Sequence, residues 1–308
     1  MWKFIFKRVF ALIPVIIGVT LIVFFIMSLS PGDPAKMILG DEASPEAVQL
    51  LRQEMGLDDP LLIQYSRYMY NAIQGDMGLS YKSKKPVTEE IWARFPNTIK
   101  LTLTAMTLAV IISLPLGIIA AVRQNSFFDG FSMLLALFGV SMPPFWFGLL
   151  LILFFSLKLG WFPSSGSESL KSIVLPSVAL GFLHMASIAR TTRSSMLEVI
   201  RQDYIRTARS KGLSYSSVIR KHALKNALIP TITVVGLQVG VLLGGAVIVE
   251  TVFAWPGVGR LMVQSIMGRD IPMVMGCIIL FATGFTIVNL IVDLLYGFID
   301  PRIRSMYT

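Results

Sequence analysis

The sequence is poor in the residues that enzymes and metal sites commonly use. Its 308 residues include one cysteine, Cys277, and two histidines, His184 and His222. A single cysteine cannot form an internal disulfide or a multi-cysteine metal site. Neither H-E-x-x-H nor the phosphate-binding pattern G-x-x-x-x-G-K-[ST] occurs in the chain. No Ser/His/Asp or paired-carboxylate arrangement is suggested either, so we expect no catalytic, cofactor-binding or metal-binding residue and do not expect an enzyme.

Charged residues are scarce as well. They make up 15% of the chain, against about 25% in soluble proteins, while 54% of the residues are hydrophobic and the mean hydropathy is +0.70. The apolar residues form six long blocks, and a helix needs about 20 apolar residues to cross lipid. The sequence therefore predicts an all-α membrane protein with six transmembrane helices. The blocks cover residues 9–29, 99–122, 131–157, 173–189, 228–253 and 272–298.

Several prolines fall inside these blocks, namely Pro14, Pro115, Pro143 and Pro144. Because lipid-buried helices tolerate proline when neighbours satisfy the freed carbonyls, we expect kinks there rather than helix ends. The first block follows a basic start, as a secretory signal does. However, it exceeds the usual apolar length of a signal, and no small-x-small cleavage site follows it. We expect an uncleaved anchor.

The predicted organisation has three parts. Residues 1–30 form the N-terminal anchor helix, residues 31–97 an extracytoplasmic loop subdomain, and residues 98–308 the core transmembrane domain. The core contains a cytoplasmic loop over residues 190–229. In the outer loop, Ser44 followed by Pro45 predicts a helix start, and Gly56 is placed to end that helix. A second helix is expected over residues 60–74.

The charge distribution predicts an orientation. If both termini lie inside, fifteen Lys and Arg residues fall on the inner side, and only four fall in the two short outer connections. Positive residues in short loops favour the cytoplasmic side, so we expect both termini to be cytoplasmic. The basic inner surface also predicts contact with anionic lipid headgroups.

The loop between the fourth and fifth blocks predicts a helical hairpin. We expect a helix over residues 197–210, a turn at Lys211–Gly212 with glycine in the left-handed conformation, and Ser214 as the next N-cap. The second helix would have an apolar face and a basic face. The apolar face comprises Tyr215, Val218, Ile219 and His222, and the basic face comprises Ser216, Ser217, Arg220, Lys221 and Lys225.

Three interpretations of this hairpin compete. A DNA-binding helix-turn-helix has similar geometry, but both ends of the hairpin enter the membrane within a few residues, so we expect no nucleic acid partner. A helix pair lying on lipid headgroups is a second interpretation. A docking surface for a cytoplasmic partner is the one that we favour.

Two ionisable residues lie within the apolar blocks. An ionisable residue in a membrane span is a functional candidate by default. For His184 we favour a neutral, hydrogen-bonded structural role. Asp293 lies five residues from the inner end of the sixth block. For Asp293 we favour a structural ion pair with a basic residue over a proton relay.

Several stretches together resemble the integral-membrane permease subunits of ABC importers of the dipeptide/oligopeptide (peptide/nickel) class. The resemblance covers nearly the whole chain. In the hairpin, "YIRTARSKGLSYSSVIRKHALKNALIP" contains Thr-Ala-Arg-x-Lys-Gly and His-Ala-Leu-x-Asn-Ala-Leu-Ile-Pro, as that class does. The further stretches are "SPGDPA", "GDMGLSY", "PVTEEIWARFPNTIKLTL", "VSMPPFW", "ETVFAWPGVGRL" and "DLLYGFIDPRIR".

One departure from the general permease motif is informative. The general motif begins Glu-Ala-Ala, whereas this chain has Arg206-Thr207-Ala208, so only Ala208 matches. Downstream, His222 replaces an Ile and Lys225 replaces a Pro. The resemblance is therefore to the peptide subclass rather than to the general pattern.

The resemblance implies a type I ABC importer permease in a bacterial plasma (inner) membrane. Such a subunit pairs with a second homologous permease, two ABC ATPase subunits and an extracytoplasmic solute-binding protein. It binds no cofactor itself, since ATP-Mg is used by the ATPases. The hairpin would couple to an ATPase, and a short helix with a tight turn suits the transmission of rigid-body motion. The implied coupling residues are Arg206, Thr207, Ala208, Arg209, Lys211, Gly212, Leu213 and His222.

The resemblance suggests roles for two further groups of residues. Gly236, Gly240 and Gly244 have the small-x-x-x-small spacing that permits close helix approach. They fit either the seam with the partner permease along the translocation path or packing within this chain. Glu250, Trp255, Pro256 and Gly257 are candidates for an outer gate. The alternative for Trp255 is an interfacial aromatic anchor.

The predicted function is a permease for di- or oligopeptides. A nickel-chelate or glutathione importer is the alternative within the class. A stand-alone ion-coupled carrier or channel is the alternative from another class, and a membrane-anchored regulator is the weakest.

Overall fold

The computed structural model describes residues 2–29, 32–40 and 42–299, without the side chains of residues 2–9, 12, 136, 140 and 293–299. Within these ranges the regular secondary structure is helical, apart from one isolated bridge between Leu79 and Pro86, so the all-α prediction is confirmed. The chain divides into two compact units. Unit 1 comprises Met1–Thr98 and Pro256–Thr286, and unit 2 comprises Ile99–Trp255 and Ile287–Thr308.

Among the described residues, four helical stretches are long and apolar enough to cross a membrane, by length and composition. They are Val87–Val122, Leu170–Ile200, Tyr215–Val252 and Ile271–Val292. A bent pair of helices could provide a fifth span, and Ile13–Leu29 forms a shorter apolar helix. The predicted number of six spans remains a prediction.

The third predicted block departs from expectation. Residues 131–157 do not form one kinked helix, because the axis changes by 107° between Phe127–Gly139 and Pro144–Lys158. Met142 is extended at φ −89° and ψ 125°, as expected of a residue that precedes a proline. Pro143 and Pro144 also lack the N–H groups that would continue the helix. Here the prolines separate two helices, whereas Pro14 lies inside a continuous helix.

Unit 1 contains α1 and the helices of the first loop, followed by the first part of α5 and the elements after Trp255. Its α3 confirms the predicted signals, since the Ser44 side chain accepts a hydrogen bond from the N–H of Ala47 and Gly56 is left-handed at φ +63°. The bounds are α1 Trp2–Leu29, α2 Pro34–Leu39, α3 Pro45–Met55, α4 Leu61–Ile73, α5 Val87–Val122, α12 Val258–Met267 and α13 Ile271–Ile299.

Two arrangements of polar groups order the first loop. Tyr65 of α4 is buried against Phe24 of α1, with ring centroids 5.6 Å apart, and its hydroxyl lies 2.9 Å from Thr20 Oγ1. At the start of α2, burial opposes ionisation of Asp33, but hydrogen bonds from Arg52 and from the Ala35 N–H outweigh it and lower the pKa of Asp33. These contacts connect the loop helices to α1 and to one another.

Asp270 organises the other side of unit 1. Its carboxylate is 2% exposed and accepts hydrogen bonds from the Ser80 hydroxyl and, at 3.1 Å, from the Tyr81 N–H. Burial, and secondly the charge of Asp270, raise the pKa of Tyr81 to about 12. Asp270 therefore holds the segment before α5 against the connection from α12 to α13.

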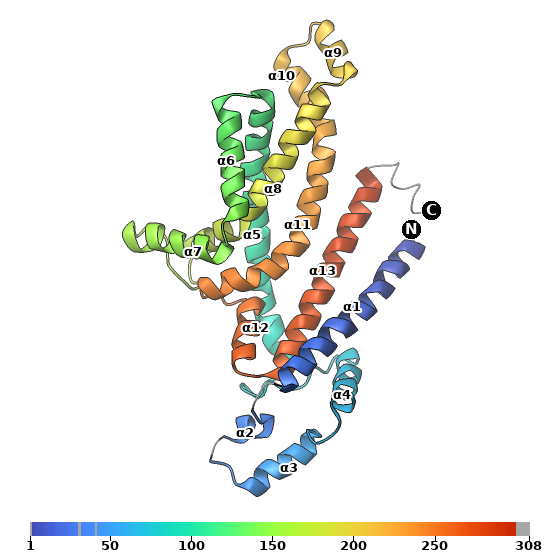
Figure 1. Ribbon diagram of the computed structural model, residues 1–308, viewed down its shortest axis with the longest axis vertical. Coiled ribbons are helices and arrows are strands. Elements are labelled where there is room, and N and C mark those ends of the chain that lie inside the picture. The colour runs from blue at the N-terminus through green and yellow to red at the C-terminus, as the bar shows by residue number, and fades with distance from the viewer. Residues whose placement is uncertain (1, 30–31, 41, 300–308) are drawn as a thin grey trace. The chain divides into compact units, whose positions relative to one another are not determined.

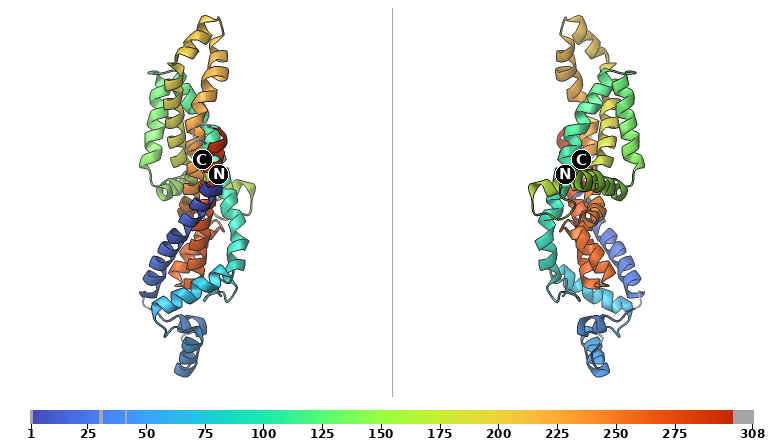
Figure 2. Two further views of the ribbon diagram at one scale, coloured as in Figure 1. Left: turned by 90° about the vertical axis from the view of Figure 1, so that its right-hand side faces the viewer. Right: turned by 90° about the vertical axis from the view of Figure 1, so that its left-hand side faces the viewer.

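Unit 2 is built on α8, which packs along α11 and contacts α6 and α7 (Figure 1). Leu180, Ile188, Leu242 and Phe253 belong to its main apolar core. Figures 1 and 2 show α9 and α10 beyond the ends of α8 and α11. The bounds are α6 Phe127–Ser141, α7 Pro144–Leu151, η1 Ile152–Lys158, η2 Leu170–Ile173, α8 Val174–Ile200, α9 Asp203–Ser210, α10 Tyr215–Ser217, η3 Val218–Ala223 and α11 Leu224–Val252.

The role of Asp270 gives a first prediction. Asp270→Ala leaves buried donors without their acceptor, which costs about 1–3 kcal/mol, so unit 1 should open more often. Cys277 is 0% exposed in the core of unit 1 and reports this opening. We expect N-ethylmaleimide to label Cys277 of the detergent-solubilised variant at least about fivefold faster.

Asp76→Ala is the matched control, because Asp76 is exposed and accepts one hydrogen bond from the Gly78 N–H at 2.8 Å. This control should label at the wild-type rate. Equal labelling rates for the Asp270 variant and the wild type would show that Asp270 does not hold unit 1 closed.

Candidate functional site

The basic hairpin has the predicted helix-turn-helix form, with one difference. The helix expected over residues 197–210 is interrupted: α8 continues to Ile200, and α9 starts anew at Asp203. Gln202 between them is extended at φ −72° and ψ 150°. Its carbonyl accepts a hydrogen bond from the Ile205 N–H at 3.1 Å, so it starts the new helix. The interruption lets α9 leave the axis of α8.

The turn after α9 depends on Gly212. Its φ is +77°, as predicted for a left-handed glycine, and its N–H donates to the Arg209 carbonyl at 3.0 Å. An added Cβ would meet nothing within 4 Å. A lack of space for a side chain therefore does not explain the glycine at this position. Glycine is favoured because the left-handed backbone conformation costs other L-residues about 1–2 kcal/mol.

The second helix of the hairpin differs in register from the prediction. Ser214 occupies the N-cap position, but its side chain makes no capping hydrogen bond. From Val218 to Ala223 the helix is a π-helix, in which residues five apart replace residues four apart as hydrogen-bonded neighbours. Val218 and Ala223 are accordingly both 0% exposed, whereas His222 is only half-buried and Tyr215 is 50% exposed.

A small apolar core holds the hairpin together. Ile205 and Ala208 of α9 pack with Val218, Ile219 and Ala223 of η3 in one buried cluster. Met196 of α8 and Ala121 of α5 belong to the same cluster. The hairpin is thus fixed to the ends of the long helices by burial of small and β-branched side chains.

The predicted coupling residues therefore divide into two groups. Ala208 is buried in the hairpin core. The others on α9 and the turn are exposed, namely Arg206, Thr207, Arg209, Lys211, Gly212 and Leu213. Arg206 lies 3.8 Å from Asp203, with both side chains more than 80% exposed, so this pair contributes little to stability. The exposed group forms a basic outer surface that a partner could contact.

An ion pair that the sequence analysis did not predict lies near this end of unit 2. Arg193 of α8 donates from Nε to Asp129 Oδ1 at 2.5 Å and from Nη2 to Oδ2 at 2.8 Å. Asp129 is 4% exposed and also accepts from the Asn125 N–H at 2.9 Å. The pattern Ser126-Phe-Phe-Asp129 is a helix-start signal that could have identified Asp129, though not its partner. The side chain of Asp293, for which an ion pair was predicted, lies outside the described residues.

His184 makes a hydrogen bond of the kind predicted. It is 4% exposed, and its Nδ1 lies 2.8 Å from Oε1 of Gln238 on α11. The amide of Gln238 in turn donates to the Ser187 hydroxyl at 3.4 Å. These contacts join α8 to α11 in the middle of the unit 2 core.

The three glycines of α11 differ in their surroundings. A Cβ on Gly236 would lie 2.7 Å from Val292 Cγ1, so Gly236 permits close approach of α13 within this chain. Gly240 is buried. Gly244 is exposed, and a Cβ there would meet nothing within 4 Å. Close packing within this chain is therefore observed at Gly236, whereas nothing in the chain packs against the Cβ position of Gly244.

The gate candidates are mostly buried. Glu250 and Trp255 are 0% and 1% exposed, and Trp255 belongs to the unit 2 core. The alternative of an interfacial anchor does not fit, since a ring enclosed by its own chain presents no face to lipid headgroups. In unit 1 the Pro256 carbonyl accepts from Asn97 Nδ2 at 3.0 Å, and Gly257 is the N-cap of α12.

Known proteins resemble the chain over nearly its full length. Residues 113–305 match the family model described as the binding-protein-dependent transport system inner membrane component. Residues 1–102 match the model of its N-terminal part. The chain is 48% identical over 326 residues to the dipeptide transport system permease protein DppB of Alkalihalophilus pseudofirmus, covering 97% of this chain and 98% of that protein. It is also 48% identical over 304 residues to the glutathione transport system permease protein GsiC of Escherichia coli strain K12, covering 99% of both.

Solved structures share the fold. A chain of the inward-facing MetNI methionine ABC transporter superposes with a TM-score of 0.57 at 19% identity, covering 70% of this chain and 96% of that one. A chain of an amino acid ABC transporter crystallised with histidines gives 0.56 at 17% identity, covering 68% and 94%. The fold, the apolar helices and the matches over both parts of the chain lead to one conclusion: this multi-pass membrane protein belongs to the family of binding-protein-dependent inner membrane components, the permease subunits of ABC importers, and within it to the peptide class.

Proposed function

We propose that this chain forms half of the translocation path of an ATP-driven importer of di- or oligopeptides. The observation that carries the substrate class is the 48% identity to a dipeptide permease and to a glutathione permease over nearly the whole chain. Glutathione is itself a tripeptide, so both relatives point to short peptides. Glutathione is the alternative substrate that the second relative favours. The family gives no support to a stand-alone carrier or channel.

The proposed complex contains a second homologous permease, two ABC ATPases and an extracytoplasmic solute-binding protein. In this proposal the present chain binds no cofactor, and ATP-Mg is hydrolysed by the ATPases. Both termini lie in the cytoplasm of a bacterium, in accord with the fifteen basic residues on the predicted inner side. The hairpin then lies on the same side as the ATPases.

The exposed surface of α9 and the turn is the proposed seat for an ATPase. Arg206, Arg209 and Lys211 are exposed there, so they suit an acidic rim on the partner. The buried hairpin core supports this role, because a fixed hairpin can pass on a rigid-body displacement to α8 and α11. His222 is half-buried and would act on the seat only through the packing of η3.

The exposed face of α11 is the proposed seam with the second permease. Leu237, Val241 and Ile248 are 48%, 52% and 47% exposed, and with Gly244 they follow the i, i+4, i+7, i+11 spacing of one helical face. Gly244 would allow the partner helix to approach closely. Gly236 is excluded from this role by its contact with Val292. For Glu250, Trp255, Pro256 and Gly257 we propose a supporting role at the outer end of the path, because Glu250 and Trp255 are buried.

Gly212→Val tests the coupling role. A β-branched residue is strained in the left-handed region, so the turn should change and the ATPase seat with it. We expect dipeptide uptake by the complete complex in proteoliposomes to fall at least about fivefold, given a strain of 1–2 kcal/mol or more, while the chain still inserts into the membrane.

Gly75→Val is the matched control, since Gly75 also has a positive φ of +91° with nothing within 4 Å of its Cβ position but lies in the first loop. This variant should couple ATP hydrolysis to uptake normally. Wild-type uptake by the Gly212 variant would rule out the coupling role of the turn.

The seam is tested by comparing Gly244→Leu with Gly236→Leu. The first substitution adds a side chain where this chain leaves space, so the isolated subunit should melt at the wild-type temperature while co-purification of the second permease is lost. The second inserts a side chain against Val292, and overpacking costs about 1–3 kcal/mol, so the subunit itself should melt at a lower temperature. Normal co-purification of the partner by the Gly244 variant would contradict the seam.

A further inference from the structure

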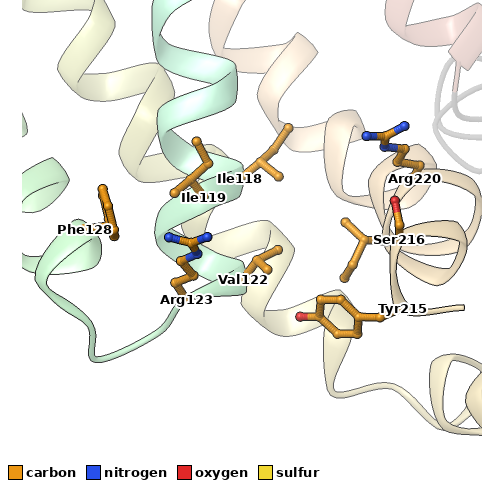
Figure 3. A pocket seen from close by; sticks show the side chains of 9 residues that line it. Ile118, Ile119, Val122, Arg123, Phe128, Tyr215, Ser216 and Arg220 are labelled. Atoms are coloured by element: carbon orange, nitrogen blue, oxygen red, sulfur yellow. The ribbon is translucent and has the colours of Figure 1, made fainter.

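A groove lies between the inner end of α5, the start of α6 and the second helix of the hairpin (Figure 3). Its volume is about 400 Å³. All the elements that form it belong to unit 2. Its apolar lining comprises Ile118, Ile119, Val122, Phe128 and Ile219. Ile119 and Phe128 are 42% and 50% exposed, so the lining is open to the surroundings rather than enclosed.

The polar lining of the groove is cationic. Arg123 follows the last residue of α5 and lies over the Phe128 ring, 5.0 Å from its centroid. Arg220 approaches from η3 with the Ser216 hydroxyl beside it, and the Tyr215 hydroxyl points toward the α5 side of the groove (Figure 3). Among the described residues neither guanidinium forms an ion pair within 4.0 Å, and the lining contains no carboxylate. The groove therefore offers two positive charges and two hydroxyls above an apolar floor.

The expected position of the groove relative to the membrane limits which ligands could bind in it. Val87–Val122 is a candidate membrane span, so Ile118, Ile119 and Val122 lie in its last turn and Arg123 directly follows it. We expect this end of the span to lie near the boundary between hydrocarbon and headgroups, because the apolar block ends at Val122 and a basic residue follows. A small soluble anion would use the arginines but not the apolar floor. A neutral lipid would use the floor but not the arginines.

We propose that this groove binds one anionic phospholipid. An acyl chain lies along Ile118, Ile119 and Val122, and the charges of Arg123 and Arg220 attract the phosphate from two sides of the groove. The proposal rests on the orientation given under the proposed function, with the hairpin on the cytoplasmic side, but not on the identity of the transported peptide. The lipid bridges the α5–α6 turn and the hairpin, so it stabilises the hairpin against the long helices.

The test uses the full complex purified in detergent, with native mass spectrometry to count retained lipid. Palmitoyl-oleoyl phosphatidylglycerol is the probe, and phosphatidylcholine with the same acyl chains is the neutral reference. A basic side chain near an anionic lipid contributes about fivefold in affinity, and two contribute about 30-fold. We expect Arg123→Gln with Arg220→Gln to reduce the preference for phosphatidylglycerol by about 30-fold.

Lys221→Gln with Lys225→Gln is the matched control. These two lysines are exposed on the same segment but do not line the groove, so the control should keep the wild-type preference. If both double variants retain phosphatidylglycerol equally, the proposal is wrong, because general attraction of a basic surface would explain the binding.

The apolar floor is tested separately. Ile119→Ala should shorten lipid retention, whereas Ile112→Ala, at a residue of the same helix that is 41% exposed and outside the groove, should not. The lipid count is repeated after the ATPase subunits are removed. If the groove retains lipid only in their absence and never in the assembled complex, the groove is an ATPase contact and the proposal fails.

Peptide uptake is measured on the same preparations. Absence of uptake by the wild-type complex with lipid preference intact would contradict the proposed function alone. If both double variants lose the preference for phosphatidylglycerol while peptide uptake is intact, the result would contradict the lipid site alone.

Discussion

In lipid, every backbone N–H and C=O group has to find its partner within the protein. This constraint explains why the described chain is helical. It also explains the behaviour of four threonine side chains. Thr20, Thr192, Thr251 and Thr286 each donate to the carbonyl four residues earlier, so they bring a polar group into a membrane helix without leaving it unsatisfied. Among the described residues, irregular backbone lies between helices, including in the first loop, at Met142 between α6 and α7, after η1, in the hairpin and after α11.

The hairpin, which we expect to lie outside the hydrocarbon, has a less regular backbone than the long helices. Gln202 leaves the helix, Gly212 adopts a positive φ, and η3 widens to a π-helix within about twenty residues. Apolar residues on the helices around these irregularities, namely Ile205, Ala208, Val218 and Ala223, are buried in one small core. The site that faces the proposed motor is therefore irregular in backbone but fixed in position.

The sequence predicted the features that depend on neighbouring residues. Ser44 and Gly56 bound α3 as expected, and Gly212 is left-handed, because caps and glycine turns are set by a few adjacent residues. The ion pair of Asp129 with Arg193 joins residues 64 positions apart, so no local pattern could pair them. The same holds for the buried ring of Trp255 and for the different surroundings of Gly236 and Gly244. The proline pair at 143–144 predicts a kink, but the structure has a break between two helices there, since two adjacent residues without N–H groups end a helix where one only bends it.

The separation of buried and exposed residues in α9 has a consequence for how such subunits diverge. Ile205 and Ala208 belong to the buried core of the hairpin, while Arg206, Thr207 and Arg209 alternate with them along the same two turns and are exposed. Arg209 also lies over the Tyr215 ring, 5.4 Å from its centroid. Selection can therefore exchange the outward side chains to follow the surface of the proposed ATPase partner without altering the buried core. For an engineer, the same alternation means that the hairpin could be re-addressed to a foreign motor by substitutions at the exposed positions alone, provided that the buried residues of its core and Gly212 are left in place.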